Sequence, residues 1–184
     1  MAFEKSAAFF LTVLLLATSP AWAVDYTIGP GDQLGIEVWK DPALTRVVTV
    51  LPDGKISFPL IGELEAGYKT VAQLKKEIEQ KIARYVPDSS TTVEVRQINS
   101  LHIYVLGRVN APGRFILSSN VTVLQALAIA GGPNTFANRK QIRIFREKKG
   151  VTTMSPLFDY DDVTAGRAIK TNILLERGDV IFVP

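Results

Sequence analysis

The sequence predicts an α+β fold built from two small β-rich modules, each with one crossing helix. Three observations lead to this fold class. Several short segments alternate apolar and polar residues, which is typical of strands with one buried face. At two places the apolar period becomes that of a helix, and both begin with a Thr-x-x-Gln pattern, at residues 70–73 and 122–125. Clusters of Gly, Pro, Asn and Asp separate these segments, as turns do.

Residues 1–23 have the pattern of a signal peptide. Lys5 gives a weakly basic start, residues 7–17 are apolar, and Ala21-Trp22-Ala23 places small residues where a signal peptidase reads them. An apolar run of this length is shorter than the roughly 20 residues that cross a bilayer as a helix, although an uncleaved membrane anchor remains the alternative. We expect cleavage after Ala23. Because residue 24 is Val, the exported chain is not expected to be a lipoprotein.

The composition excludes several classes of function. The chain has no Cys, which excludes disulfides and thiol chemistry. It has one histidine, His102, which excludes a Ser-His-Asp triad and a two-histidine metal site; we expect this side chain to be structural. The formal net charge is +3 without a basic tract, so no nucleic-acid partner is expected. We expect no catalytic residue, no metal and no cofactor.

The first module is predicted to span residues 24–98. A turn at residues 29–32 precedes an alternating strand, and a β-branched run ends at Pro52-Asp53-Gly54, a pattern that favours a hairpin. A helix follows, with its apolar stripe at Val71, Leu74, Ile78, Ile82 and Tyr85. The predicted strands are residues 34–39, 46–51, 56–61 and 91–96.

The second module is predicted to span residues 99–184 and to be β-grasp-like, with strands and one crossing helix. Its short helix begins at Thr122 and ends at Gly131-Gly132-Pro133. Residues 124–130 are mostly apolar on every side, which predicts a buried helix. The predicted strands are residues 102–106, 114–117, 142–145, 152–157 and a closing strand at 178–183.

One acidic cluster, residues 159–162, is a candidate for chemistry. Two carboxylates of a glycosidase must face each other across a sugar, which neighbours on one loop rarely do. The cluster also lacks the spaced ligands and the Gly of an EF-hand loop. A solvated turn that caps a short helix near Val163 is the interpretation that the spacing favours.

These segments together resemble a known family. The chain is similar to polysaccharide export proteins of the Wza type, in which an N-terminal polysaccharide export domain is followed by an SLBB (soluble-ligand-binding β-grasp) domain. The stretches that carry the resemblance follow in the expected order and cover nearly all of the exported chain: residues 26–34, 50–56, 58–62, 105–109, 112–115, 130–133 and 178–184.

The resemblance implies a periplasmic homo-oligomer that surrounds the path of a capsular or extracellular polysaccharide chain. It also implies an inner-membrane polysaccharide co-polymerase as a partner. The motif residues are then structural rather than catalytic. They are Gly31, Asp32, Asp53, Gly54, Pro59, Gly62, Gly107, Pro112, Gly113, Gly131, Gly132, Gly178 and Asp179.

The sequence departs from this family in two ways. Many relatives carry a lipid-modified Cys after the signal peptide, and the larger ones continue past the last strand into a pore-forming helix. We therefore expect a periplasmic protein that associates with the outer membrane through a separate outer-membrane protein.

Two other functions remain open. The chain would be a soluble periplasmic carbohydrate-binding module without a transport role if Tyr104, Phe115 and Phe136 stacked on sugars instead of packing in the core. Stoichiometry separates this alternative from a conduit. A polysaccharide-modifying enzyme is disfavoured because no acid/base pair is visible.

Overall fold

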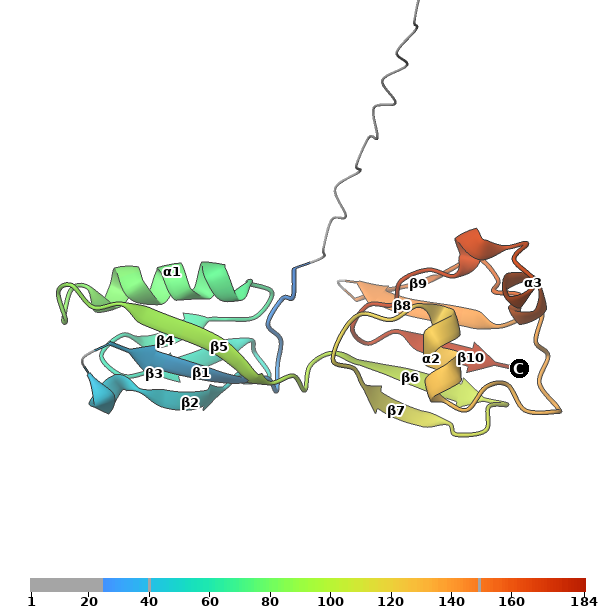
Figure 1. Ribbon diagram of the computed structural model, residues 1–184, viewed down its shortest axis with the longest axis horizontal. Coiled ribbons are helices and arrows are strands. Elements are labelled where there is room, and N and C mark those ends of the chain that lie inside the picture. The colour runs from blue at the N-terminus through green and yellow to red at the C-terminus, as the bar shows by residue number, and fades with distance from the viewer. Residues whose placement is uncertain (1–24, 40, 149) are drawn as a thin grey trace, which may run out of the picture.

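The computed structural model describes residues 25–39, 41–148 and 150–184. The predicted signal peptide lies outside the described residues. Two modules lie side by side along the long axis of the molecule, and a short link between strands β5 and β6 joins them (Figure 1). Helices and small sheets occur in both modules, which confirms the α+β fold class. None of the described helices is long and apolar enough to cross a membrane.

The first module is built around a sheet in which β1 lies between β2 and β5 and is antiparallel to both. Strands β3 and β4 form a separate hairpin. The elements are β1 (Gln33–Val38), η1 (Pro42–Leu44), β2 (Arg46–Thr49), β3 (Lys55–Phe58), β4 (Gly62–Glu65), α1 (Val71–Ile82) and β5 (Thr91–Gln97).

The hairpin predicted at Pro52-Asp53-Gly54 is wrong in its strand pairing. Strand β2 pairs with β1 and β3 pairs with β4, so this turn carries the chain from one sheet to the other. The reason is a second tight turn directly after β3, where Leu60 and Gly62 have φ angles of 65° and 70°. That turn folds β4 back onto β3 and occupies its pairing edge.

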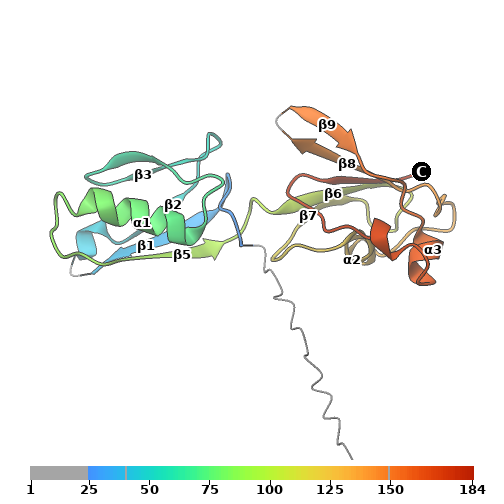
Figure 2. The same ribbon diagram turned by 90° about the horizontal axis from the view of Figure 1, so that it is seen from above.

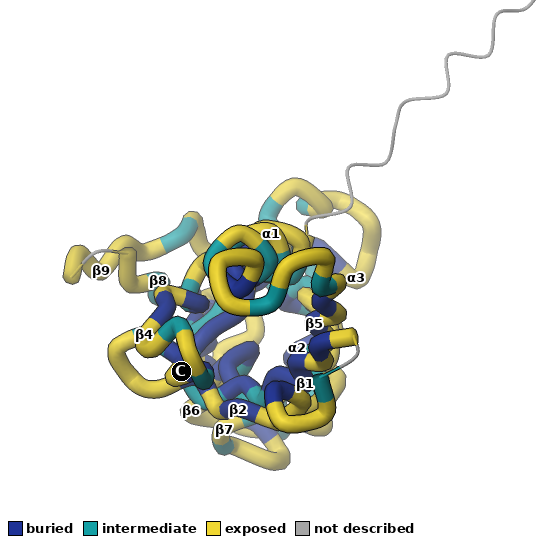
Figure 3. Tube along the Cα trace, turned by 90° about the vertical axis from the view of Figure 1, so that its left-hand side faces the viewer, coloured by how far each residue is buried: buried dark blue, intermediate teal, exposed yellow. Residues whose placement is uncertain are grey.

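Helix α1 forms as its apolar spacing predicts. Leu74, Ile78 and Ile82 are fully buried, and Thr70 and Gln73 form the predicted capping box. The helix ends earlier than the stripe suggested, because Tyr85 lies beyond its last turn and is exposed. Burial of the stripe against β5 gives this module a core of its own (Figure 3).

The second module contains a five-stranded sheet in the order β7-β6-β10-β8-β9. The predicted closing strand, β10, lies in the middle of this sheet, parallel to β6 and antiparallel to β8. Helices α2 and α3 lie on one side of the sheet (Figure 2). The elements are β6 (His102–Gly107), β7 (Gly113–Ile116), α2 (Val123–Ile129), β8 (Arg143–Lys148), β9 (Val151–Met154), α3 (Tyr160–Thr164), η2 (Ile169–Thr171) and β10 (Val180–Val183).

The prediction that the short helix is buried on every side is wrong. Helix α2 buries Val123, Ala126 and Leu127, but Ile129 is 47% exposed. A two-turn helix that lies on one face of a sheet has only one face to bury, whatever the composition of the other. Its capping box between Thr122 and Gln125 forms as predicted.

Candidate functional site

Two Gly-Asp turns with the same geometry precede a central strand in each module. Asp32 precedes β1, and its Oδ2 accepts a hydrogen bond of 2.8 Å from the backbone amide of Gly29. Asp179 precedes β10, and its Oδ2 accepts a 2.8 Å bond from the amide of Glu176. Each aspartate amide donates back to the carbonyl of that same residue, at 3.1 and 3.2 Å. Both carboxylates are fully buried.

The Asp32 carboxylate also holds the link between the modules. Its Oδ1 accepts hydrogen bonds from the backbone amides of Asn99 and Ser100, at 2.9 and 2.8 Å. The Ser100 hydroxyl donates to Oδ2 at 2.9 Å, and the Asn99 side chain donates to the carbonyl of Gly31 at 2.9 Å. A buried acceptor of the first module is therefore satisfied by the segment that leads into the second.

Tyr26 connects the two hydrophobic cores at the same place. Its ring packs against both core clusters, and its hydroxyl donates a short hydrogen bond to Asp32. The hydroxyl also lies 3.1 Å from Ser100 Oγ. Because both cores contact one ring, rotation of one module against the other would expose apolar surface and break the Asp32 bonds.

A side chain of the second module reaches back to the first across this junction. Arg177 Nη2 donates to the carbonyl of Thr27 at 2.7 Å. The guanidinium lies over Gly29, where an added Cβ would stand 1.9 Å from Arg177 Nη1. The first glycine of the Gly-Pro-Gly-Asp turn thus leaves room for an arginine 148 residues along the chain.

Hydrogen bonding determines the protonation of this junction. Burial alone raises the pKa of Asp32, but the bonds from Tyr26, Gly29, Ser100 and Asn99 outweigh it, so that the pKa is lowered. Burial and the bond to Asp32 raise the pKa of Tyr26 to about 12. The junction therefore holds an ionised carboxylate and a neutral phenol over the physiological pH range.

Asp179 is satisfied by an arginine instead of a link segment. Arg146 on β8 donates from Nε to Oδ1 at 2.8 Å and from Nη2 to Oδ2 at 2.6 Å. Its Nη1 binds Glu176 at 2.6 Å, and Nη2 also reaches the carbonyl of Leu174 at 3.0 Å. This fork–fork pair ties the loop before β10 to the neighbouring strand.

The structure places the other motif residues in turns and at strand ends rather than together in one site. Gly107 has a φ of 90°, and a Cβ there would stand 2.1 Å from the carbonyl oxygen of Val183, so only glycine lets β6 approach β10 at this point. Asp53 accepts a 3.0 Å bond from the amide of Lys55. The remaining motif residues lie in the β2–β3 turn (Gly54), the β3–β4 turn (Pro59 and Gly62), the β6–β7 turn (Pro112 and Gly113), the end of α2 (Gly131 and Gly132) and the turn before β10 (Gly178).

The acidic cluster is the helix-capping turn that its spacing favoured. Asp159 caps α3 by accepting a 3.0 Å bond from the amide of Asp162. Asp161 pairs with Arg139, and Asp162 pairs with Arg167. The carboxylates are neutralised by these arginines and do not converge on a common point.

The aromatic candidates of the second module divide between core and surface. Phe115 packs against the core. Tyr104 is 36% exposed and meets the ring of His102 edge to face, while burial and the neighbouring Arg114 lower the pKa of His102. Phe136 is 76% exposed, so the expectation that it packs in the core is wrong: it lies in the loop after α2, where only its backbone is held, by the Asn134 side chain.

Sequence reasoning missed the partners of the two aspartates, namely Tyr26, Ser100, Arg146 and Arg177. A signal was present: a Gly-Asp pair directly before an apolar strand occurs in both modules. An aspartate at the entrance to a buried strand needs several donors, and its repetition indicates two related polar centres.

Comparison with known proteins agrees with this arrangement of modules. A family described as "Polysaccharide biosynthesis/export protein" matches residues 21–96, and an "SLBB domain" family matches residues 101–183. The EPS I polysaccharide export outer membrane protein EpsA of Ralstonia nicotianae is 32% identical, over 89% of this chain and 48% of its own length.

Two further relatives are the exopolysaccharide production protein ExoF of Rhizobium meliloti and the capsule polysaccharide export outer membrane protein CtrA of Neisseria meningitidis. ExoF is 32% identical, over 62% of this chain and 30% of its own length. CtrA is 24% identical, over 84% and 43%. The chain thus spans about half the length, or less, of the relatives it matches. The two family matches in this order and the similarity to these relatives show that the chain belongs to the polysaccharide export protein family.

Proposed function

We propose that this protein is a periplasmic, non-enzymatic component of a capsular or extracellular polysaccharide export apparatus, in which copies of the chain form a ring or conduit around the polymer. The relatives that it matches are themselves named for polysaccharide export or production. The signal peptide predicted at residues 1–23 supports export from the cytoplasm.

The observation that carries this proposal is the locked junction around Asp32. A closed ring requires each subunit to present its two contact faces at a fixed angle, since small changes of angle open the ring into a spiral. Tyr26 packs on both cores and Ser100 is bound through both its amide and its hydroxyl, so the two modules turn as one body. Two modules in one rigid subunit would build two stacked layers of a ring.

An uncovered apolar sheet face supports self-assembly. On the face of the second sheet opposite α2, the strand register places Tyr104 beside Val180 and Leu106 beside Phe182. Leu106 and Phe182 are 44% and 38% exposed, and Ile116 on the neighbouring β7 is 55% exposed. Contiguous apolar surface of this kind marks interaction sites in soluble proteins, and a second copy of the chain is the occupant that a ring requires.

The proposed partners are the polysaccharide chain, an inner-membrane polysaccharide co-polymerase and a separate outer-membrane protein. In this arrangement the protein provides a path and no chemistry.

The test is a clean deletion strain complemented with variants, in which polymer is measured outside the cell and inside the envelope. Loss outside with retention inside is expected in the deletion strain, and the wild-type gene restores export. Phe182→Glu is expected to break the oligomer and block export, whereas Phe136→Glu, an equally radical change at an exposed site away from the sheet, leaves both intact.

Unchanged external polymer in the deletion strain would refute the export role. A monomeric native mass for the exported wild-type protein would refute the ring and favour the carbohydrate-binding module. Circular dichroism of the two variants separates loss of assembly from loss of folding.

A further inference from the structure

An exposed tryptophan lies at the end of β1, far from the junction and from the uncovered sheet face. Trp39 is 67% exposed, although its backbone is held in place by a 2.8 Å hydrogen bond from its amide to the carbonyl of Ser90. A large aromatic ring that is fixed in position and left open to solvent forgoes the burial that usually stabilises this residue type. Such a ring is placed to contact something else.

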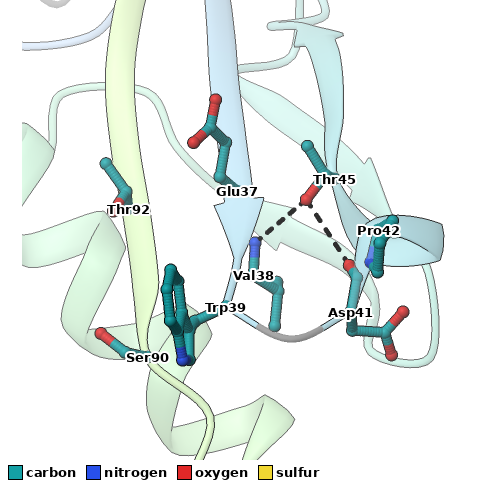
Figure 4. A pocket seen from close by; sticks show the side chains of 8 residues that line it. All are labelled: Glu37, Val38, Trp39, Asp41, Pro42, Thr45, Ser90 and Thr92. Atoms are coloured by element: carbon teal, nitrogen blue, oxygen red, sulfur yellow. Dashed lines mark hydrogen bonds between the residues drawn. The ribbon is translucent and has the colours of Figure 1, made fainter.

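Polar side chains surround this ring in a defined pattern. Glu37 and Thr92 are directly opposed across β1 and β5, and Ser90 lies opposite Trp39 at the end of the same ladder. These four residues therefore share one face of the sheet. Asp41, Pro42 and Thr45 form the opposite wall of a pocket of about 620 Å³, which Figure 4 shows from close by.

The second wall of the pocket is held by local hydrogen bonds. Thr45 Oγ1 accepts a bond of 3.3 Å from the amide of Val38, and Asp41 Oδ1 accepts a bond of 3.1 Å from the amide of Ala43 (Figure 4). Asp41 thereby caps the short η1 helix, and Pro42 stands at the first position of that helix. A pocket with walls fixed in this way loses little conformational entropy when a ligand enters.

Pocket chemistry selects the ligand class. An exposed indole offers a flat apolar face, and the carboxylates of Glu37 and Asp41 offer acceptors that need donors. The hydroxyls of Ser90 and Thr92 serve as either donor or acceptor. A pyranose ring has the complementary surface, since it presents C–H groups on its flat side and hydroxyl donors around its edge.

We propose that the Trp39 pocket is a carbohydrate subsite that binds one or two sugar rings of a passing polysaccharide chain, with Trp39 stacking on a ring and Glu37 and Asp41 accepting hydrogen bonds from its hydroxyls. The identity of the polymer rests on the proposed export function; the site itself rests on the pocket. An open, shallow subsite of this kind suits a chain that must slide, because it holds each ring weakly.

The competing occupant is a neighbouring subunit with Trp39 as an interface anchor. Tryptophan is frequent in such anchors, but Glu, Asp and Ser are depleted around them because charged groups are costly to cover. Two carboxylates and three hydroxyls beside the ring favour a hydroxylated ligand.

The test uses the full chain carrying Trp22→Phe, so that Trp39 is the sole tryptophan. The probe is the oligosaccharide mixture released by mild acid hydrolysis of the extracellular polymer of the source strain. We expect the mixture to shift or quench the Trp39 emission. By titration calorimetry, Trp39→Ala is expected to weaken binding by at least about tenfold, and Glu37→Gln with Asp41→Asn by less.

Phe136→Ala is the matched control, since this residue is also an exposed aromatic but belongs to the other module. Its binding is expected to equal that of the parent. Equal binding by the parent and Trp39→Ala, or no binding at all, overturns the subsite. Loss of oligomers in Trp39→Ala with unchanged sugar binding identifies a subunit anchor and also overturns it.

The same variants in the deletion strain keep the two proposals distinct. Full export by Trp39→Ala together with lost export in the deletion strain would refute the subsite as a part of export and leave the conduit standing. Normal export in the deletion strain would refute the conduit, whatever the pocket binds.

Discussion

Ser100 donates two hydrogen bonds to Asp32, one from its backbone amide at 2.8 Å and one from its hydroxyl at 2.9 Å, across 68 residues of sequence. This contact joins the turn that starts the first sheet to the link that leads into the second. Because Asp32 is fully buried, every donor that it holds would be left unsatisfied, or the charge left unpaired, if the modules separated.

Removal of the Asp32 carboxylate is expected to destabilise both modules. Asp32→Ala leaves the buried amides of Gly29, Asn99 and Ser100 without an acceptor, which costs about 3 kcal/mol in the free energy of unfolding. Urea unfolding measures the change. Asp53→Ala, which removes one exposed contact, is the control and should cost less than about 1 kcal/mol. Equal losses for the two variants would contradict the role of the junction.

Acid stability should depend on the same carboxylate. Folding lowers the pKa of Asp32 from 3.8, so the unfolded chain takes up this proton first as the pH falls. The stabilisation is therefore present above about pH 4 and is lost as the pH falls through the folded-state pKa. Asp32→Asn is expected to unfold with a weaker pH dependence in this range, measured by thermal denaturation at stepped pH. A wild-type dependence in the variant would contradict the assignment.

Alkaline stability should depend on Tyr26. Folding raises its pKa from 10.0 to about 12, mainly through burial and then through the bond to Asp32, so the unfolded chain loses the phenolic proton first as the pH rises. The stabilisation is complete below pH 10 and is lost as the pH rises through about 12. Tyr26→Phe should be less stable at neutral pH but lose less stability on alkaline titration. The exposed Tyr68→Phe is the control, and an identical profile for both variants would count against the prediction.

Loss of the arginine that neutralises Asp179 should be costly. Arg146→Met leaves a fully buried carboxylate without its two donors, and we expect a loss of about 3 kcal/mol. Combining Arg146→Met with Asp179→Asn should restore part of this loss, since no buried charge then remains. Arg167→Met breaks an exposed pair and should cost less than about 1 kcal/mol. Denaturant midpoints test all three, and additive losses in the double variant would argue against coupling.

Two glycines separate backbone strain from close packing. Gly107 and Gly132 have φ angles of 90° and 79°, but an added Cβ meets the Val183 carbonyl oxygen at 2.1 Å only at Gly107, and nothing within 4 Å at Gly132. Gly132→Ala should therefore cost about 1 kcal/mol, from strain alone, and Gly107→Ala several-fold more. Comparable unfolding midpoints for the two variants would show that β6 and β10 can separate at this point.

The local elements were predictable because their signals are local. The capping boxes at Thr70 and Thr122 and the stripe of α1 depend on residues a few positions apart, and they form as predicted. The strand run 46–51 was recognised, but its pairing was not, because the partner of a strand depends on which edge is already occupied. The exposed side of α2 failed for a related reason: composition states what a helix can bury, and only its neighbours decide what it does bury.

The sequence by itself determined the order of strands and helices, the capped helix ends, the structural role of the Gly-Asp turns as an expectation, and the family. These depend on short spacings or on stretches read in order. Only the tertiary structure decided that Asp32 holds Ser100, that Tyr26 joins two cores, that Arg146 neutralises Asp179 and that Trp39 stands open in a pocket. Each of these relationships is made by side chains far apart in sequence or by exposure, and a one-dimensional pattern records neither the direction of a side chain nor what covers it.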